Sequence, residues 1–221
     1  MWSRSIHFFF FITNYENFFN PVTFKNPLCL KLKMRTKSTI RKFWDFLQED
    51  TWQSFVVTLL IAFILIKFVL FPLLSFITGT SLPLVIVESC SMYHTQTFTE
   101  IMTNQVYKDY SIDPENATAW PFQNGFAKGD IIFVVSPKNI KIGDVIIYEA
   151  GQSYPIIHRV IRHDSGTVAT KGDNNPSLLP FEPSILEEKI MGKAVFRIPA
   201  LGWVKLIFFE PFHPSQRGFC K

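Results

Sequence analysis

Cysteine is scarce in this chain, and none of the spacings that bind metal occurs in it. The three cysteines, Cys29, Cys90 and Cys220, are scattered and odd in number, so the sequence predicts no disulfide framework, and Cys90 is expected to be a small packing residue. There is no HExxH motif and no closely spaced pair of cysteines. His94 and His163 are therefore expected in surface or packing roles, and the sequence predicts neither a metal nor a cofactor.

A strong excess of charge of one sign is also lacking, since the formal net charge is +4 over 221 residues. No base-reading or base-stacking module accompanies the basic residues, so nucleic acid is not expected as a partner. Six basic residues instead crowd shortly before a long apolar run: Lys31, Lys33, Arg35, Lys37, Arg41 and Lys42. Such a cluster is typical of the cytoplasmic flank of a membrane helix.

The first 33 residues lack the small-residue cleavage site that would follow the apolar part of a signal peptide. Met34 opens a stretch that reads as a natural N-terminus. We therefore expect residues 1–33 to be a disordered tail or an upstream extension from a misassigned start. Residues 34–53, basic and then aromatic, are expected to form a cytoplasmic and interfacial segment.

One hydrophobic run is long enough to cross a membrane. It extends almost unbroken from Phe55 to Ile77 and predicts a transmembrane helix at residues 54–78, matching about 30 Å of hydrocarbon. Pro72 is expected to kink or end this helix. Lys67 would lie at mid-depth, where a charge costs about 2.5–3.5 kcal/mol on insertion scales.

The basic flank also predicts the orientation of the chain. With that flank in the cytoplasm, the residues after Gly79 lie outside. This orientation would expose Asn116-Ala117-Thr118, an acceptor sequence for N-glycosylation.

From Ser81 the sequence changes to short β-branched runs bounded by turn residues, which predicts a separate domain over residues 81–210 and a tail at 211–221. Strands are expected at residues 84–87, 131–135, 145–148, 156–161, 167–170 and 191–198. The pattern predicts a mainly β domain, a compact barrel or sandwich with antiparallel pairing. Residues 93–128 show no clean periodicity and form a long inserted segment, which is expected to be functional or mobile.

Three residues in this domain have the chemistry of a serine protease. Ser91 follows an apolar strand, His158 lies within another, and Asp173 follows a Gly in a turn. A serine hydroxyl needs a base to become a nucleophile, histidine can accept that proton near neutral pH, and a carboxylate can orient the histidine. Each residue alone has an ordinary structural reading, and only their combination predicts a serine protease at a membrane surface.

The stretches Glu88–Met92, 158–160 and Lys171–Asn175 resemble type I signal peptidases of the archaeal and endoplasmic-reticulum kind, peptidase family S26, in which a histidine replaces the lysine base of most bacterial relatives. The resemblance covers roughly residues 40–210. It implies a signal-peptidase-like β-barrel with one transmembrane helix in the cell membrane, and an enzyme that cleaves signal peptides from secreted proteins. Its partners would be preproteins, membrane lipid and the protein translocation channel. The amino-acid sequences of these motifs also resemble the archaeal members, which suggests an archaeal origin.

The resemblance also implies roles for single residues. Ser91 would be the acylating nucleophile, His158 its general base, and Asp173 the acid that orients the base or supports the site. Ser89 would donate to the oxyanion hole. A substrate strand would pair by β-addition with the strand that carries Leu84, Ile86 and Val87, and small pockets would accept alanine-like residues one and three positions before the cut.

One departure from the family pattern leaves the second acid open. Family members commonly carry it six positions after the first, where this chain has Leu179, and Glu182 is the candidate replacement. Two alternatives to a general signal peptidase therefore stay open. One is an inactive, membrane-anchored accessory subunit, and the other is a membrane serine protease for specialised precursors.

Overall fold

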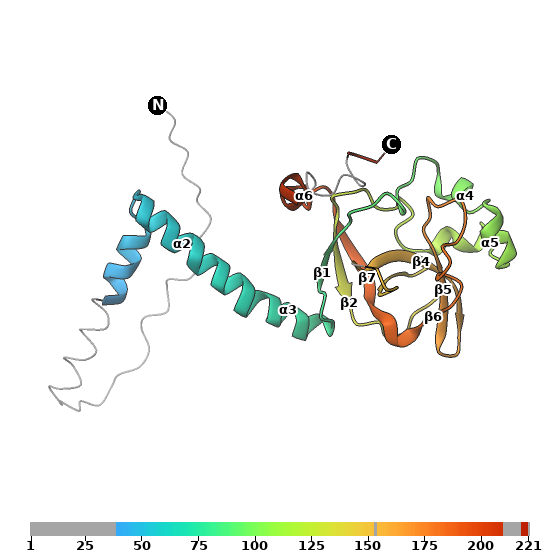
Figure 1. Ribbon diagram of the computed structural model, residues 1–221, viewed down its shortest axis with the longest axis horizontal. Coiled ribbons are helices and arrows are strands. Elements are labelled where there is room, and N and C mark those ends of the chain that lie inside the picture. Colours follow the sequence, from blue (N-terminus) through green and yellow to red (C-terminus); the bar gives the residue numbers. More distant parts are fainter. Residues whose placement is uncertain (1–38, 153, 210–217, 221) are drawn as a thin grey trace, which may run out of the picture. The chain divides into compact units, whose positions relative to one another are not determined.

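The computed structural model describes residues 39–152, 154–209 and 218–220 (Figure 1). The chain divides into two compact units, Met1–Ile61 and Ala62–Lys221. The expectation for residues 1–33 lies outside the described residues, as do Cys29 and most of the expected tail. In the first unit, residues 39–47 are helical and largely exposed.

A 27-residue helix, Trp52–Thr78, is long and apolar enough to cross a membrane. It consists of α2 (Trp52–Leu65), a π-helical turn η1 (Ile66–Leu70) and α3 (Phe71–Thr78). This helix covers the hydrophobic run that the sequence predicts as a transmembrane segment.

Pro72 was expected to kink or to end the helix. The helix does not end there but continues to Thr78. The π turn lies immediately before the proline, and there the Phe71 amide donates to the Ile66 carbonyl, five residues back. A widened turn of this kind accommodates a residue that cannot complete the usual ladder of hydrogen bonds. Gly79 ends the helix in the left-handed region, with φ +68°, and donates to the Ser75 carbonyl.

The second unit contains a seven-stranded antiparallel sheet in the order β1-β2-β7-β3-β4-β5-β6. The strands are β1 (Leu84–Ile86), β2 (Ile131–Val135), β3 (Val145–Tyr148), β4 (Ile156–Asp164), β5 (Thr167–Lys171), β6 (Ile185–Leu186) and β7 (Ile190–Ile198). The expectation of a mainly β, antiparallel domain is confirmed, and each expected run forms a strand. Sequence reasoning missed β6, because two residues are too few to show a period. In the described part of the chain the sheet is an open half-barrel, with β1 and β6 as its edges.

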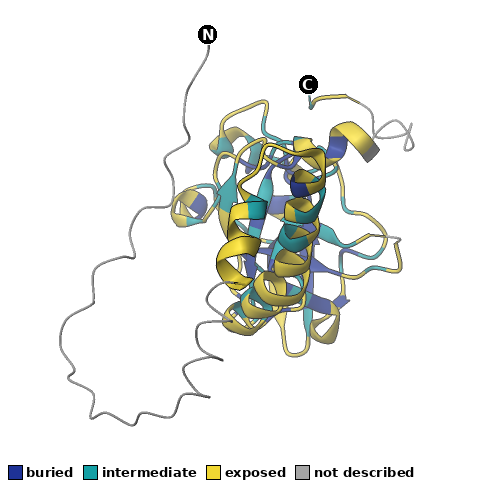
Figure 2. Ribbon diagram, turned by 90° about the vertical axis from the view of Figure 1, so that its left-hand side faces the viewer, coloured by how far each residue is buried: buried dark blue, intermediate teal, exposed yellow. Residues whose placement is uncertain are grey.

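Strand β3 joins two hydrophobic cores. All four of its residues are buried, and because side chains alternate along a strand, Val145 and Ile147 enter one core while Ile146 and Tyr148 enter the other. Figure 2 shows the buried residues concentrated in the strands of the sheet. The first part of strand β4, residues 156–159 including His158, pairs with the whole of β3 and is therefore held beside both cores.

The segment 93–128 is a packed helical layer. It contains α4 (Phe98–Ile101), α5 (Gln105–Asp109) and the 3-10 turn η2 (Asn116–Ala119). A third core cluster joins this layer to β4 and β5: Met102, Tyr107, Ala117, Ile161 and Ala169. A capping box at Thr97 and a cap at Asn104 start the two short helices, and these caps were the local signal that the search for periodicity missed.

Gly129 and Gly166 provide a matched test of how helix α6 (Trp203–Phe209) packs on the sheet. Both glycines have positive φ, +89° and +85°, so alanine is strained at either position. A Cβ at Gly129 would overlap the Trp203 ring, whereas a Cβ at Gly166 would meet nothing within 4 Å. We expect Gly129→Ala to lower the free energy of unfolding by about 1–3 kcal/mol more than Gly166→Ala, measured by chemical denaturation in detergent. Equal losses would contradict this packing of Trp203.

Candidate active site

Ser91 lies in the turn that follows β1, and its backbone is held by the loop after β5. The Asn174 amide donates to the Ser91 carbonyl at 2.8 Å, and Asn174 Nδ2 donates to the Cys90 carbonyl at 3.0 Å. The next residue, Met92, is fully buried in the first core and accepts from the Phe126 amide at 2.7 Å through its carbonyl. Ser91 itself is half-buried, and its Oγ lies 3.2 Å from Ser89 Oγ.

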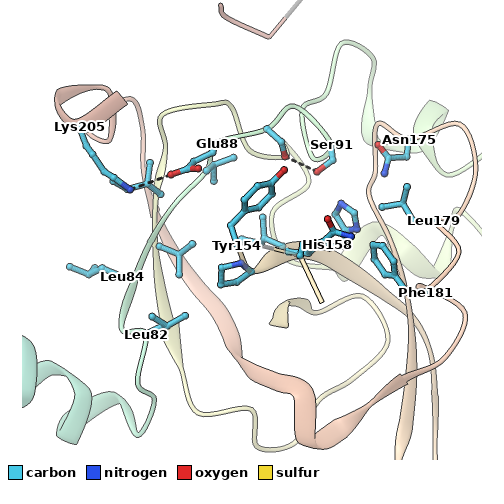
Figure 3. A pocket seen from close by; sticks show the side chains of 18 residues that line it. Leu82, Leu84, Glu88, Ser91, Tyr154, His158, Asn175, Leu179, Phe181 and Lys205 are labelled. Atoms are coloured by element: carbon cyan, nitrogen blue, oxygen red, sulfur yellow. Dashed lines mark hydrogen bonds and ion pairs between the residues drawn. The ribbon is translucent and has the colours of Figure 1, made fainter. Parts of the chain in front are cut away.

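A cavity of about 640 Å³ brings Ser91 and His158 together with the apolar strand β1 (Figure 3). Residues 84–89 line it from one side, and Tyr154, Ile156 and Phe181 contribute further apolar walls. Figure 3 shows the Ser91 and His158 side chains at the same cavity, which extends along β1 towards Leu82. A cavity of this shape can accommodate an extended peptide along β1.

His158 contacts a carboxylate that lies outside the position given by the family pattern. The His158 side chain is buried, and its Nδ1 is hydrogen-bonded to Glu182 Oε1. The other ring nitrogen, Nε2, faces the loop after β5, where a Cβ on Gly172 would lie 2.7 Å from it. Among the described residues no hydrogen bond joins Ser91 to His158, and in sites without substrate such bonds are often long.

The Glu182 carboxylate is fixed next to the position where the family pattern expects the second acid. Glu182 is fully buried, and its Oε2 accepts from the Leu179 amide at 2.5 Å. Its backbone closes the same turn, because the Glu182 amide donates to the Leu179 carbonyl at 3.0 Å and its carbonyl accepts from Thr170. The structure therefore brings together His158 and Glu182, the residue that the sequence gives as a candidate replacement.

Asp173 contacts other residues than His158. Its carboxylate accepts from Arg159 Nη2 at 2.7 Å, from Tyr107 at 3.0 Å and from His94 Nε2 at 2.9 Å. Burial raises the pKa of the Asp173 carboxyl, but the charge of Arg159 and the hydrogen bonds from His94 and Arg159 outweigh it and hold the pKa well below its usual range. Among the described residues Asp173 makes no hydrogen bond to His158, whose Nδ1 contacts Glu182 instead. Of the two roles expected for Asp173, its contacts favour the second, support of the loop that holds Ser91.

Arg159 was missed as a site residue, although it follows His158 directly. It is fully buried, and besides Asp173 it donates to the carbonyls of Pro121, Phe122 and Gly143. A charged residue between the apolar pairs Ile156-Ile157 and Val160-Ile161 was the available signal, since such a residue is seldom buried without partners.

The expectation that Cys90 is a small packing residue is wrong, because Cys90 forms a disulfide with Cys220, 130 residues further on. Sequence spacing alone cannot pair such distant cysteines. The predicted topology held a usable signal, however. It separates Cys29 from the other two cysteines by the membrane helix and leaves an even pair in the outer domain.

A helix long and apolar enough to cross a membrane precedes a β domain in which a serine and a histidine line one elongated cavity, an arrangement compatible with a membrane-anchored serine hydrolase. No family model matches the chain. Curated relatives do match it, and three of them are named signal peptidase complex catalytic subunit SEC11. That of Komagataella phaffii is 35% identical over 102 residues, covering 38% of this chain and 60% of the relative. Those of Clavispora lusitaniae and Candida tropicalis are 36% and 35% identical over 97 residues, each with 38% of this chain and 58% of the relative covered.

The matched region is therefore homologous to type I signal peptidases, and the eukaryotic relatives favour the endoplasmic-reticulum kind over the archaeal one. The match spans about six tenths of the length of these relatives.

The buried partners of Asp173 predict a large stability loss on its removal. Asp173→Ala leaves the Arg159 guanidinium buried without its carboxylate, and we expect the free energy of unfolding at neutral pH to fall by about 3–5 kcal/mol. The pKa of Asp173 is lowered on folding. The stabilisation that its carboxylate provides is therefore fully present at pH values above the ordinary aspartate pKa. It is lost as the pH falls through the folded value, so wild type and variant should converge in strong acid.

Asp164→Ala is the matched control. It breaks the exposed Arg162–Asp164 ion pair of 2.8 Å, and we expect a change of less than about 1 kcal/mol. Denaturant titrations of both variants across pH provide the comparison. Similar small losses at the two positions would contradict the structural role of Asp173.

Proposed function

We propose that this chain is a membrane-anchored serine endopeptidase that removes N-terminal signal peptides from translocated proteins. The observation that carries the proposal is the cavity beside β1, where Ser91 and His158 meet and Glu182 holds the far nitrogen of the histidine. Homology to signal peptidase catalytic subunits supports the same reading.

The contacts of His158 suggest how the proton moves. With Glu182 as acceptor, Nδ1 carries the proton and Nε2 remains the basic nitrogen. Nε2 takes the Ser91 proton as Oγ attacks the scissile carbonyl, and returns it to the leaving amine when the acyl-enzyme forms. Water then attacks the acyl-enzyme with Nε2 again as the base, and Ser91 recovers its proton.

The oxyanion of the tetrahedral intermediate would accept from the Ser91 amide and from the Ser89 hydroxyl. Ser89 is exposed at the cavity, and its Oγ lies 3.2 Å from Ser91 Oγ, within reach of the oxygen that develops charge. Donors fixed around such an oxygen are usually among the largest contributions to catalysis.

Strand β1 offers its outer edge to the substrate, with one change from the sequence expectation. The backbone of Val87 is used by the sheet, because its amide donates to Asp130 and its carbonyl accepts from Gly129. Hydrogen-bonding directions alternate along a strand, so Leu84 and Ile86 present their amides and carbonyls outward. We propose that these two residues pair with the substrate, whereas Val87 contributes to the core.

We further propose that the N-terminus is cytoplasmic and that the catalytic domain faces an oxidising compartment, which in a eukaryotic cell is the lumen of the endoplasmic reticulum. The Cys90–Cys220 disulfide supports this side of the membrane. Asn116 is exposed at the start of η2, so its glycosylation stays a prediction of the same topology. The partners proposed are signal-peptide-bearing preproteins, membrane lipid, the other subunits of a signal peptidase complex and the translocation channel.

One prediction from the proposed function concerns the nucleophile and the base. Ser91→Ala and His158→Ala should each abolish cleavage of a radiolabelled preprotein by the detergent-solubilised protein or its complex, because neither acylation nor proton transfer remains. Ser177→Ala and His163→Ala are controls outside the cavity and should cleave like the wild type. Residual cleavage by Ser91→Ala would show that the nucleophile is another residue.

The same experiment separates the alternatives. If the folded wild-type protein cleaves nothing in its complex, the inactive accessory subunit is the better reading. A specialised protease would cleave only a narrow set of precursors. None of the described residues that line the cavity comes from 93–128, so the structure offers no narrowing of access by this segment.

A second prediction concerns Glu182. Glu182→Gln should lower kcat by about 10²–10⁴, because the amide no longer stabilises the imidazolium and permits the wrong tautomer, while KM changes little. Glu187→Gln, which alters an exposed carboxylate paired with His163, is the control. Adding Leu179→Asp to Glu182→Gln restores an acid at the family position and should recover part of kcat. A pH profile of kcat that is unchanged in Glu182→Gln would contradict the role.

A further inference from the structure

The turn that carries Ser91 is linked to the C-terminal part of the chain at two points. Cys90, the residue directly before Ser91, forms the disulfide with Cys220. Two residues earlier, Glu88 pairs with Lys205 of α6 at 3.2 Å. The four residues Glu88–Ser91 are thus connected on one side to elements that lie more than a hundred residues away in sequence.

The C-terminal partner is itself anchored to the sheet. Phe219, next to Cys220, packs on Trp203 with ring centroids 4.5 Å apart. Trp203 Nε1 donates to the Lys128 carbonyl at 2.9 Å, and the Gly202 amide donates to the Gly129 carbonyl at 2.7 Å. Cys220 therefore connects Cys90 to a fixed point and not to a loose end.

On its other side the same turn is held by hydrogen bonds alone. Asn174 donates to the carbonyls of Cys90 and Ser91, and no covalent link joins this loop to the turn. Rotation of the Cys90–Ser91 peptide would move Ser91 Oγ relative to His158, because Ser91 lies beyond the last sheet hydrogen bonds of this strand, those of Val87. The disulfide opposes this rotation from the side that Asn174 does not hold.

We propose that Cys90 and Cys220 are positioning residues for the Ser91 nucleophile, and that reduction of their disulfide lowers turnover without unfolding the domain. The inference rests on the proposed function, in which Ser91 is acylated. In the reduction, a dithiol such as dithiothreitol supplies two electrons and two protons. The S–S bond breaks, two cysteine thiols form, and the reductant closes to its own cyclic disulfide. Cys90 and Cys220 are both only half-buried, so a small reductant can reach them.

The test measures kcat and KM for preprotein cleavage by the detergent-solubilised protein in its complex, before reduction, after reduction and after reoxidation. We expect reduction to lower kcat by about ten- to a hundredfold with little change in KM, since a misplacement of roughly 1 Å at a nucleophile has effects of this size. Reoxidation should restore the rate. Cys220→Ser should show the reduced rate under all conditions, and Cys90→Ser/Cys220→Ser should be no slower than the single variant.

Phe219→Ala tests the anchor of Cys220, because it removes the contact with Trp203 but leaves the disulfide in place. Its oxidised form should have a kcat between those of the oxidised and the reduced wild-type protein, and reductant should lower that kcat further. Intrinsic tryptophan fluorescence in each state reports whether the domain remains folded. Where Cys220→Ser fails to fold during synthesis, the reversible reduction of the wild-type protein decides the question.

Three outcomes would overturn the inference. A wild-type kcat that changes less than twofold on reduction shows that the disulfide does not position Ser91. A faster reduced enzyme shows that the crosslink restrains the C-terminal residues over the site instead. Unfolding of the domain on reduction would show that the disulfide stabilises the fold and does not specifically position Ser91. Failure of the proposed function is a different result, because the oxidised wild-type protein would then cleave no preprotein.

Discussion

The buried ion pair between Asp173 and Arg159 joins parts of the domain that are distant in sequence. Arg159 follows His158 in β4, and Asp173 precedes Asn174, which holds the backbone of Ser91. Arg159 also donates to carbonyls of the 93–128 layer, at Pro121 and Phe122. The strand of the proposed base, the loop that supports the proposed nucleophile and the inserted layer thus depend on one guanidinium. Moving any one of them would leave a charge or a carbonyl buried without a partner.

A second buried charge fixes the path of the same loop. The Lys171 ammonium donates to the carbonyls of Gly172 and Asn175 at 3.0 and 2.7 Å, and burial lowers the pKa of Lys171. Replacing such buried ions by apolar residues is often neutral for stability, so their contribution here is better sought in geometry. Lys171 and Asp173 are directed to different partners from positions two residues apart, and this leaves the backbone around Asn174 little freedom. A rigid loop at this place is what an acyl-transfer site requires, because the nucleophile must keep its distance from the base while substrate enters.

Much of the fold could be predicted from sequence, because strand period and turn residues are local signals. The bounds of β2 and β3 were predicted to the residue, and Ser91 and His158 could be singled out because each follows or lies within such a strand. Local signals did not predict the pairings of Cys90 with Cys220, of His158 with Glu182 or of Arg159 with Asp173, although the predicted topology pointed to the first and the family pattern offered Glu182 as a candidate. Each depends on which loops close against which strands, and this is decided by packing of the whole sheet. Pro72 is the opposite case, since its local chemistry was read correctly but a widened turn before it allows the helix to continue.

In the proposed site, Glu182 supplies the carboxylate that the family pattern expects at position 179, and the path of the chain between these two residues accounts for the change of position. A shift of three residues would carry an aspartate away from His158, but the turn from Leu179 to Glu182 folds back on itself, with the Glu182 amide bonded to the Leu179 carbonyl. The extra methylene of glutamate then returns the carboxylate to the Leu179 amide and to the histidine. Glutamate loses more rotamer freedom on burial than aspartate does. The Leu179 amide and His158 Nδ1, one on each carboxylate oxygen, offset that loss. In the proposed site the orientation of His158 therefore depends on the single turn that carries Glu182.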